Sequence, residues 1–134
     1  MEGKVTKIGK TKILKARAGE ITLPKIAGFA FGSGGADGST VLVPGETLKN
    51  EFLRKAIDGH TLKINENKCE YYCTLNTNEA NGKSISEIGL YDTEGDIIMI
   101  ANFTAKGKDP EVYMKFEIDD ICLLYTSDAA DDMQ

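Results

Sequence analysis

The residue types that usually carry catalysis are scarce in this chain, and their spacing does not assemble a catalytic site. The single histidine, His60, follows Asp58 and Gly59, and no serine lies in a nucleophile motif such as G-x-S-x-G. A hydrolase built on His60 would need a serine or cysteine and a carboxylate to converge on it in a pocket. We therefore expect His60 to be a surface or turn residue. The sequence predicts a protein that is not an enzyme and has no catalytic residues.

The cysteine, acidic and glycine-rich segments do not match a metal or cofactor site. Cys69 and Cys73 would lie about 13 Å apart along an extended strand, beyond disulfide reach, and one histidine cannot complete a zinc site. Residues 92–96, Asp-Thr-Glu-Gly-Asp, carry alternate carboxylates but lack the ligand pattern of a calcium loop. No lysine follows the glycine-rich residues 32–39 as a phosphate-binding loop requires. We expect no metal and no cofactor.

Composition and charge narrow the classes of function further. The chain has 134 residues, with 16 Lys+Arg against 21 Asp+Glu and a net charge of −5, which argues against nucleic acid as a partner. The positive charge is concentrated near the N-terminus, on Lys4, Lys7, Lys10, Lys12, Lys15 and Arg17. The longest apolar run, residues 97–101, is far shorter than the roughly 20 residues of a membrane helix. With no signal-peptide pattern, we expect synthesis in a cytoplasm and no membrane partner.

A short basic helix is predicted over residues 5–18. Its apolar residues recur at helical spacing on one face and most of its cations lie on the other, while Gly19 is a natural stop. Lys12 and Leu14 break this pattern. The basic face is either a solvated helix surface or a docking surface for an acidic partner.

A second helix is predicted after Thr47, a suitable N-cap. The residues that support it recur at i, i+4, i+5, i+8 and i+9, and they are Leu48, Phe52, Leu53, Ala56 and Ile57. Asp58 and Gly59 should end this helix.

The rest of the chain alternates with a period of two, which is typical of strands. About six strands are expected, at residues 21–31, 60–65, 69–76, 84–92, 96–103 and 112–119. Short turns at 65–68 and 93–95 predict two antiparallel hairpins, and the consecutive apolar residues 97–101 place the second hairpin at the centre of the sheet. The predicted fold is mainly β with N-terminal helices (α+β), an antiparallel β-sandwich-like domain preceded by one or two short helices.

Four sequence blocks resemble the N-terminal domain of phage tail-collar fibre proteins, and they occur in the family's order. Residues 85–100 resemble the pattern E-[IV]-[GA]-L-[YF]-D-x-x-G-x-[LI], through Glu87, Ile88, Gly89, Leu90, Tyr91, Asp92 and Gly95. The opening 6–9, the glycine loop 29–35 with Ser33 where Asp is common, and the stretch 48–57 resemble the other blocks. The resemblance runs over about residues 5–119.

The resemblance implies a virion structural component, made in the bacterial host cytoplasm, that joins a phage or prophage tail fibre to the baseplate. It implies a homotrimer whose partner is a baseplate or tail protein. The alternative is a small carbohydrate- or receptor-binding β domain of a tail fibre. A glycan site would need exposed aromatic residues on one loop cluster, and the loops at 32–45 and 76–83 contain none.

The signature residues are expected to build structure. Ile88 and Leu90 should fill one face of a central strand, with Glu87 and Tyr91 on the other. Gly89 should permit close backbone approach in that strand. Asp92 to Gly95 should form the hairpin turn.

The C-terminal end departs from the family pattern. We expect residues 1–120 to form the tail-collar type domain. Residues 122–132 resemble translated sequencing-adapter sequence, so residues 121–134 are expected to be a non-native or disordered tail. On this interpretation the natural protein continues past Asp120 into a fibre shaft.

Overall fold

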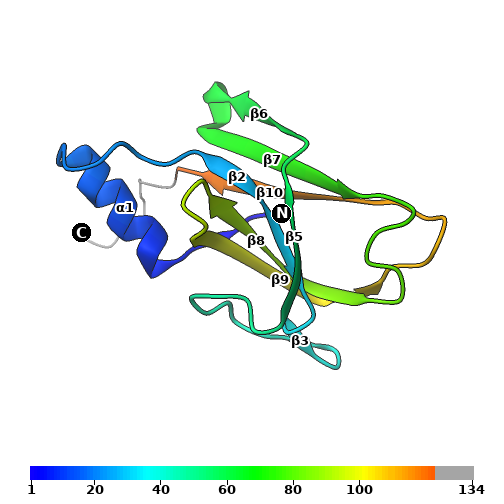
Figure 1. The fold of residues 1–134 in the computed structure, drawn as a ribbon. Coiled ribbons are helices and arrows are strands. Elements are labelled where there is room, and N and C mark those ends of the chain that lie inside the picture. Colours follow the sequence, from blue (N-terminus) through cyan, green and yellow to red (C-terminus); the bar gives the residue numbers. More distant parts are fainter. Residues whose placement is uncertain (123–134) are drawn as a thin grey trace.

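The structure, a computed structural model, describes residues 1–122, and Figure 1 shows one helix beside two layers of strands. Most of the tail expected at 121–134, residues 123–134, lies outside the described residues. In chain order the elements are β1 (Lys4–Val5), α1 (Lys7–Arg17), β2 (Ile26–Gly32), β3 (Ala36–Asp37), β4 (Thr40–Val41), β5 (Glu51–Ala56), β6 (Gly59–Lys63), the 3-10 turn η1 (Ile64–Glu66), β7 (Lys68–Leu75), β8 (Ser84–Asp92), β9 (Ile97–Gly107) and β10 (Met114–Ile121).

The N-terminal helix forms close to its predicted position. The hydroxyl group of Thr6 caps α1, accepting a hydrogen bond from the Gly9 N–H at 3.1 Å and donating one to the Ile97 carbonyl at 2.8 Å. Gly19, at φ +83°, ends the helix as expected. The helix begins at Lys7 rather than at residue 5, because Val5 belongs to β1 and pairs with Met99 of β9.

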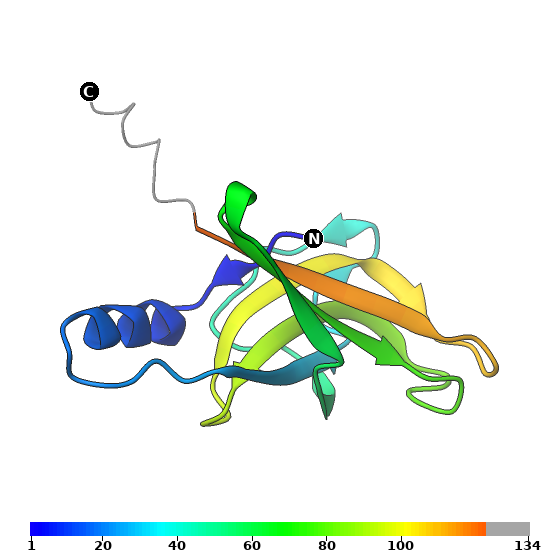
Figure 2. The same cartoon turned by 90° about the horizontal axis from the view of Figure 1, so that it is seen from above.

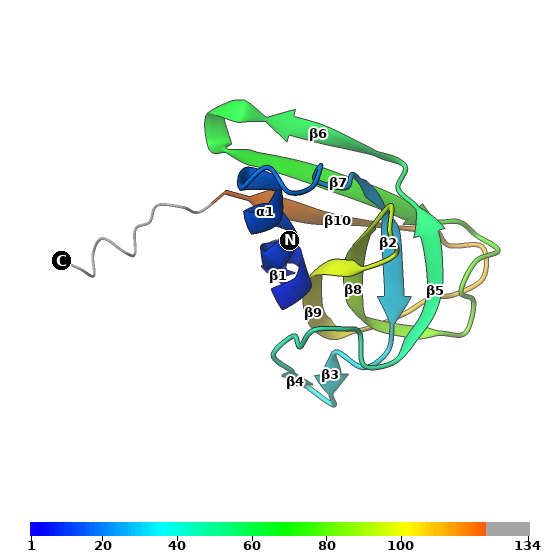
Figure 3. The same ribbon diagram turned by 60° about the vertical axis from the view of Figure 1, so that its left-hand side comes forward.

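Two antiparallel sheets form the layers of the protein. The larger has the strand order β1-β9-β8-β2-β5 and the smaller has the order β10-β7-β6. Figure 3 shows the smaller sheet lying over the larger one, with the β3–β4 hairpin on the far side of the larger sheet. The predicted antiparallel sandwich with a short N-terminal helix is confirmed. The β8–β9 hairpin is also central, since β8 pairs with β9 on one side and β2 on the other.

The main hydrophobic core lies between the two sheets. The larger sheet contributes Phe29, Phe31, Ile88 and Leu90, and the smaller contributes Cys73, Leu75, Phe116 and Ile118. The rings of Phe31 and Phe116 meet edge to face across the layers, with centroids 5.4 Å apart. Cys73 is a free thiol, and burial raises its pKa to about 12, so it behaves as a small apolar side chain.

The larger sheet is also covered on its outer face. Ala30, Ile97 and Ile100 form a second buried cluster there with Leu48, which lies just before β5. Gly89 makes room for this cover: a Cβ at position 89 would lie 2.8 Å from Leu48 Cδ1 and 3.1 Å from the Met99 carbonyl oxygen. Burial on both faces explains why apolar residues follow one another along β9.

The second helix predicted at residues 48–57 is wrong. This stretch contains β5, an edge strand that pairs with β2 from Glu51 to Ala56. The apparent helical stripe combined Leu48, which covers the outer face of the sheet, with Leu53 and Ile57, which pack on the core. Pairing with β2 satisfies the backbone groups of this segment, and that tertiary context overrides a local amphipathic pattern. The chain then passes from the larger sheet into β6.

The remaining strands match their predictions with small shifts. The strand expected at 21–31 is β2, which begins only at Ile26, because residues 21–25 belong to the connection that follows α1. Both predicted hairpins form: β6 pairs antiparallel with β7, and β8 pairs antiparallel with β9. Gly95, at φ +88°, occupies the left-handed conformation that the β8–β9 turn requires.

Gly89→Ala is expected to lower the free energy of unfolding by about 2 kcal/mol, because the added methyl group would overlap Leu48 in a packed layer. Gly107→Ala is the matched control at the open end of β9, where a Cβ meets nothing within 4 Å, and it should change stability by less than about 0.5 kcal/mol. Urea unfolding followed by circular dichroism measures both. Equal stability of the two variants would contradict the close approach at position 89.

Candidate functional site

His60 lies on the surface, as predicted. It is exposed on β6, an edge strand of the smaller sheet, and pairs across to Tyr71 of β7 with ring centroids 5.8 Å apart. The polar centres of the described residues lie elsewhere, around the β8–β9 hairpin and on the outer face of the smaller sheet.

The first polar centre joins the helix to the β8–β9 turn through a buried lysine. The ammonium nitrogen of Lys12 lies 2.6 Å from Asp92 Oδ2, 2.8 Å from Glu94 Oε1 and 2.7 Å from Asp96 Oδ2. The side chain of Lys12 is 9% exposed and that of Asp92 is 1% exposed, so their ion pair is almost completely removed from water. The alternate carboxylates at 92–96 therefore converge on a lysine ammonium group.

Asp92 is also bonded within its own turn. Its Oδ1 accepts the N–H groups of Glu94 at 3.0 Å and Asp96 at 3.1 Å. Burial alone would raise the pKa of Asp92, but the Lys12 ammonium and these two N–H groups outweigh it, and the pKa is lowered. The pKa of Lys12 is raised, because hydrogen bonds to the three carboxylates outweigh the cost of its burial. The pair is therefore ionised throughout the neutral range.

The second polar centre is Glu87, which lies near the middle of β8 and is 1% exposed. Its Oε2 accepts the N–H groups of Gly34 at 2.9 Å and Asn50 at 2.8 Å, and its Oε1 accepts the N–H of Lys49 at 2.9 Å. One carboxylate therefore fastens two separate loop segments to β8.

The glycine loop fits closely around this centre. The hydroxyl group of Ser86 accepts the Gly35 N–H at 2.9 Å, and a Cβ at Gly35 would overlap the Ser86 carbonyl group. A Cβ at Gly34 would lie 3.0 Å from Glu87 Oε2. The glycine loop, the stretch after Leu48 and the β8 signature are thus three sequence blocks that meet at one point.

The other signature residues lie in or beside the larger sheet. Ile88 and Leu90 face the core, and Gly89 lies under Leu48 on the opposite face. Tyr91 is half-buried on that outer face, with the Arg54 guanidinium carbon 4.9 Å from its ring centroid. Gly95 lies in the turn, and its carbonyl accepts a hydrogen bond from Arg54 at 2.8 Å. None of these positions forms a wall of an enclosed cleft among the described residues.

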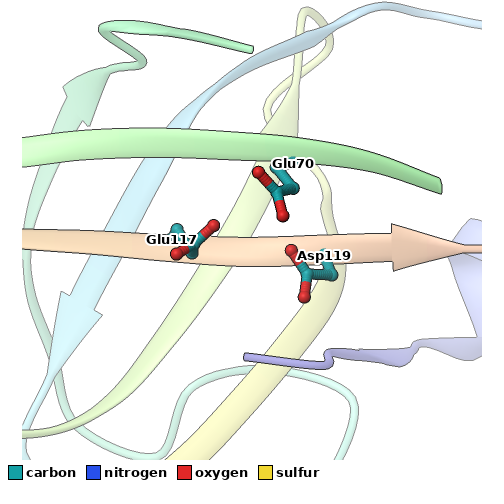
Figure 4. A group of neighbouring side chains, drawn as sticks. All are labelled: Glu70, Glu117 and Asp119. Carbon is teal, nitrogen blue, oxygen red and sulfur yellow. The ribbon is translucent and has the colours of Figure 1, made fainter. Parts of the chain in front are cut away.

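A further group of carboxylates lies on the outer face of the smaller sheet. Figure 4 shows Glu70 of β7 beside Glu117 and Asp119 of β10. Cations surround this group: Lys63 Nζ lies 3.1 Å from Glu70, and the terminal ammonium group of Met1 lies 3.4 Å from Asp119. Lys68 lies 3.6 Å from Glu70 and 3.8 Å from Asp119. The group is a surface ion-pair network, and its charge is largely matched by the protein.

The outer side of α1 carries both exposed apolar side chains and exposed cations. Figures 1 and 2 show that this helix projects from one end of the sandwich. We use the name "α1 surface" for its exposed side chains and those of the segment that follows it, namely Lys7, Ile8, Lys10, Leu14, Lys15, Arg17, Ile21 and Leu23. A pocket of about 280 Å³ lies beside it, lined mainly by apolar side chains including Ile13, Leu23 and Ile98.

Two contacts hold the inner side of α1 against the sandwich. Gly9 lets the helix approach β9, since a Cβ there would lie 2.7 Å from the Ile98 carbonyl oxygen. Lys12, one turn further along, reaches the carboxylates of the β8–β9 turn. The sequence predicts neither buried centre: Lys12 only interrupts the helical pattern, and the alternation of β8 places Glu87 on a face of the strand without indicating its partners. The sequence feature that could have indicated the first centre is a lysine on the apolar side of the helix together with the alternating carboxylates at 92–96.

Comparison with known proteins identifies a family that this chain matches. A family model described as phage tail-collar fibre protein, N-terminal, matches residues 1–117, which include every strand of the larger sheet and most of the smaller one. No curated protein and no solved structure matches the chain. Within residues 1–122, the helical segments are too short and too polar to cross a membrane.

Replacing Lys12 with methionine is expected to lower the free energy of unfolding by about 3 kcal/mol at pH 7, because Asp92 would stay buried without its cation. Lys10→Met is the matched control on the same helix, at an exposed position, and should be nearly neutral. Hydrogen exchange should also show faster exchange of the α1 amides in Lys12→Met only. Equal stability and exchange in the two variants would show that the ion pair does not fasten the helix.

The ion pair between Lys12 and Asp92 makes the free energy of unfolding depend on pH. Since folding lowers the pKa of Asp92, its stabilising effect is complete above the ordinary aspartate pKa of about 4 and is lost as the pH falls further. The stability difference between wild type and Lys12→Met should therefore shrink as the pH falls, because the buried Asp92 of the variant has lost its cation and takes up a proton at a higher pH than Asp92 of wild type. A difference that stays constant down to pH 2 would contradict this assignment.

Glu87→Gln is expected to cost about 2 kcal/mol of stability, because one carboxylate oxygen is replaced by an NH2 group that faces backbone N–H donors. Glu117→Gln, an exposed glutamate on β10, is the control and should be close to neutral. Chemical unfolding measures the difference. If both variants unfold at the same denaturant concentration, Glu87 does not organise the loops.

Proposed function

The chain belongs to the phage tail-collar fibre protein family, and we propose that it is the attachment module that joins a phage or prophage tail fibre to the tail baseplate. The observation that carries this proposal is the extent of the family match, which covers residues 1–117 and therefore nearly the whole described sandwich. A member of this family is a component of a tail fibre, and its partners are other tail components.

The use of the family-signature residues supports a structural role. Ile88 and Leu90 are in the core, Glu87 fastens two loops and Asp92 fastens the helix, so these side chains are occupied in holding the fold together. The surface that remains available for a partner is made of other residues. We propose that the signature builds a rigid module whose exposed faces bind neighbouring parts of the virion.

We further propose that three copies assemble about the fibre axis. Tail fibres are elongated, and a cyclic trimer presents three equivalent modules to the baseplate at the fibre root. In this arrangement the interior of each sandwich stays intact and contacts between copies involve only exposed side chains.

The location of the module in the virion tests the attachment proposal against the receptor-binding alternative. A short epitope inserted beside Gly38, in the exposed β3–β4 turn where a Cβ meets nothing within 4 Å, gives a label without touching the core. Virions of the phage that encodes this chain are incubated with Fab fragments against the epitope and imaged by electron microscopy. We expect up to three Fab fragments at the junction of each fibre with the baseplate.

Two results would count against attachment. Fab fragments at the distal fibre tips would favour a carbohydrate- or receptor-binding domain. Fab fragments that label no tail structure, with the tagged protein shown by immunoblot to be in the virion, would place the module away from the fibre root. Untagged virions are the control for non-specific labelling.

A further inference from the structure

We propose that the α1 surface is the contact between this module and the tail, and that its partner is a protein surface rich in carboxylates with an apolar recess for Leu14. This inference rests on the proposed attachment function and names the residues and the partner chemistry that it would use.

The α1 surface combines exposed apolar side chains with exposed cations. Leu14 is 63% exposed and Ile8 is 40% exposed on the helix, and Leu23, in the connection that follows it, is 49% exposed. Lys10 and Arg17 lie on the same outer side of α1 as Leu14, and no acidic residue occurs in the helix. A single apolar anchor bordered by cations is typical of a protein interface with an ionic rim.

Charge is distributed very unevenly between this helix and the rest of the chain. Residues 4–17 hold six of the 16 cations and no acid, so all 21 acidic residues lie elsewhere. The one buried cation of the helix, Lys12, is already held by three carboxylates, whereas Lys7, Lys10, Lys15 and Arg17 have exposed side chains. The partner that complements this surface is acidic.

Within residues 1–122, a second copy of this chain offers no cluster of three carboxylates that lacks ammonium partners. One of its two clusters, Asp92, Glu94 and Asp96, is bonded to Lys12, and the other, Glu70, Glu117 and Asp119, is bonded to Lys63, Lys68 and the N-terminus. An extended polyanion such as DNA or an anionic bilayer would also face the acidic remainder of the chain. A bilayer further requires a broad apolar helix face, and the outer side of α1 has Leu14 among cations. A localised acidic patch on another tail protein would contact only α1, so it would not face the acidic remainder of the chain and would not need a broad apolar helix face.

The helix is held in place before binding. The Thr6 cap, the close approach at Gly9 and the Lys12 ion pair fix its position on the sandwich. A rigid surface loses little conformational entropy on association, so few contacts can support binding. The pocket of about 280 Å³ beside Ile13 and Leu23 can receive an apolar side chain of the partner.

The test uses the whole 134-residue chain and, as probe, fibreless tails of the phage that encodes it, made from an amber mutant of the fibre gene. Lys10→Glu/Arg17→Glu reverses two charges on the α1 surface. Lys106→Glu/Lys115→Glu is the matched control, with the same change in net charge at exposed positions on β9 and β10. Leu14→Ser tests the apolar anchor. Binding to tails is measured by co-sedimentation, and thermal unfolding checks that each variant folds.

We expect wild type and control to bind tails with dissociation constants within about twofold of each other. We expect at least a tenfold weaker affinity for Lys10→Glu/Arg17→Glu and for Leu14→Ser, and a loss of wild-type binding as salt is raised. Tails that bind all variants equally would overturn the α1 contact and leave the attachment function standing. Wild type that does not bind tails at all would instead count against the attachment function itself.

Co-sedimentation with vesicles of phosphatidylcholine with 30% phosphatidylglycerol tests whether the α1 surface binds an anionic membrane and not an acidic protein. We expect no co-sedimentation of the wild-type chain with them at a salt concentration where it binds tails. Binding to vesicles that Lys10→Glu/Arg17→Glu abolishes would overturn the assignment of an acidic protein partner.

Discussion

Strand β8 runs through the middle of the larger sheet with apolar groups packed on both of its faces, and the arrangement of the other segments depends on this burial. The strand carries two carboxylates, Glu87 near its middle and Asp92 at its C-terminal end, and each is almost completely removed from water. A buried carboxylate is stable only when hydrogen bonds or a cation compensate it. Glu87 is compensated by three backbone N–H groups of the loop segments around Gly34 and Lys49, and Asp92 by the ammonium group of Lys12. The polar requirements of one strand thus position the glycine loop, the segment before β5 and the N-terminal helix.

This arrangement explains why the most distinctive sequence block of the chain need not mark a binding site. Its apolar members fill the core, Gly89 admits Leu48, and its carboxylates are used up by internal partners. A polar residue that already has its full set of buried partners has little capacity to bind anything else. We therefore expect contacts with the rest of a virion to come from side chains outside the block, and α1 offers exposed apolar groups together with exposed cations.

The sequence predicts the elements whose signal is local and misses those decided by distant partners. Period-two alternation predicts the strands that became β7, β8 and β10, and Gly19 correctly predicts the end of α1. The prediction of a helix at residues 48–57 is wrong because it rests on only five apolar positions. The same spacing arises from a strand, β5, that is preceded by a leucine packing on the other face of the sheet. Likewise, Lys12 is 80 positions from Asp92 in the sequence, so helical periodicity shows that Lys12 breaks the apolar pattern but does not identify its partner. The fold class can therefore be predicted from the sequence, whereas the partners of the buried Lys12 and Glu87 are known only once the tertiary structure is known.

The position of Lys12 also determines what α1 can offer to a partner. A helix fastened only by apolar contacts would have to turn its leucine and isoleucines inward, leaving a uniformly charged outer side. Here an internal ion pair and a glycine contact provide the attachment, so Leu14 and Ile8 stay exposed among the lysines. Cations on such a surface raise the rate of encounter with an acidic partner, and an apolar anchor slows dissociation once it is seated. Burying one lysine is therefore what allows the opposite side of a short helix to combine both properties.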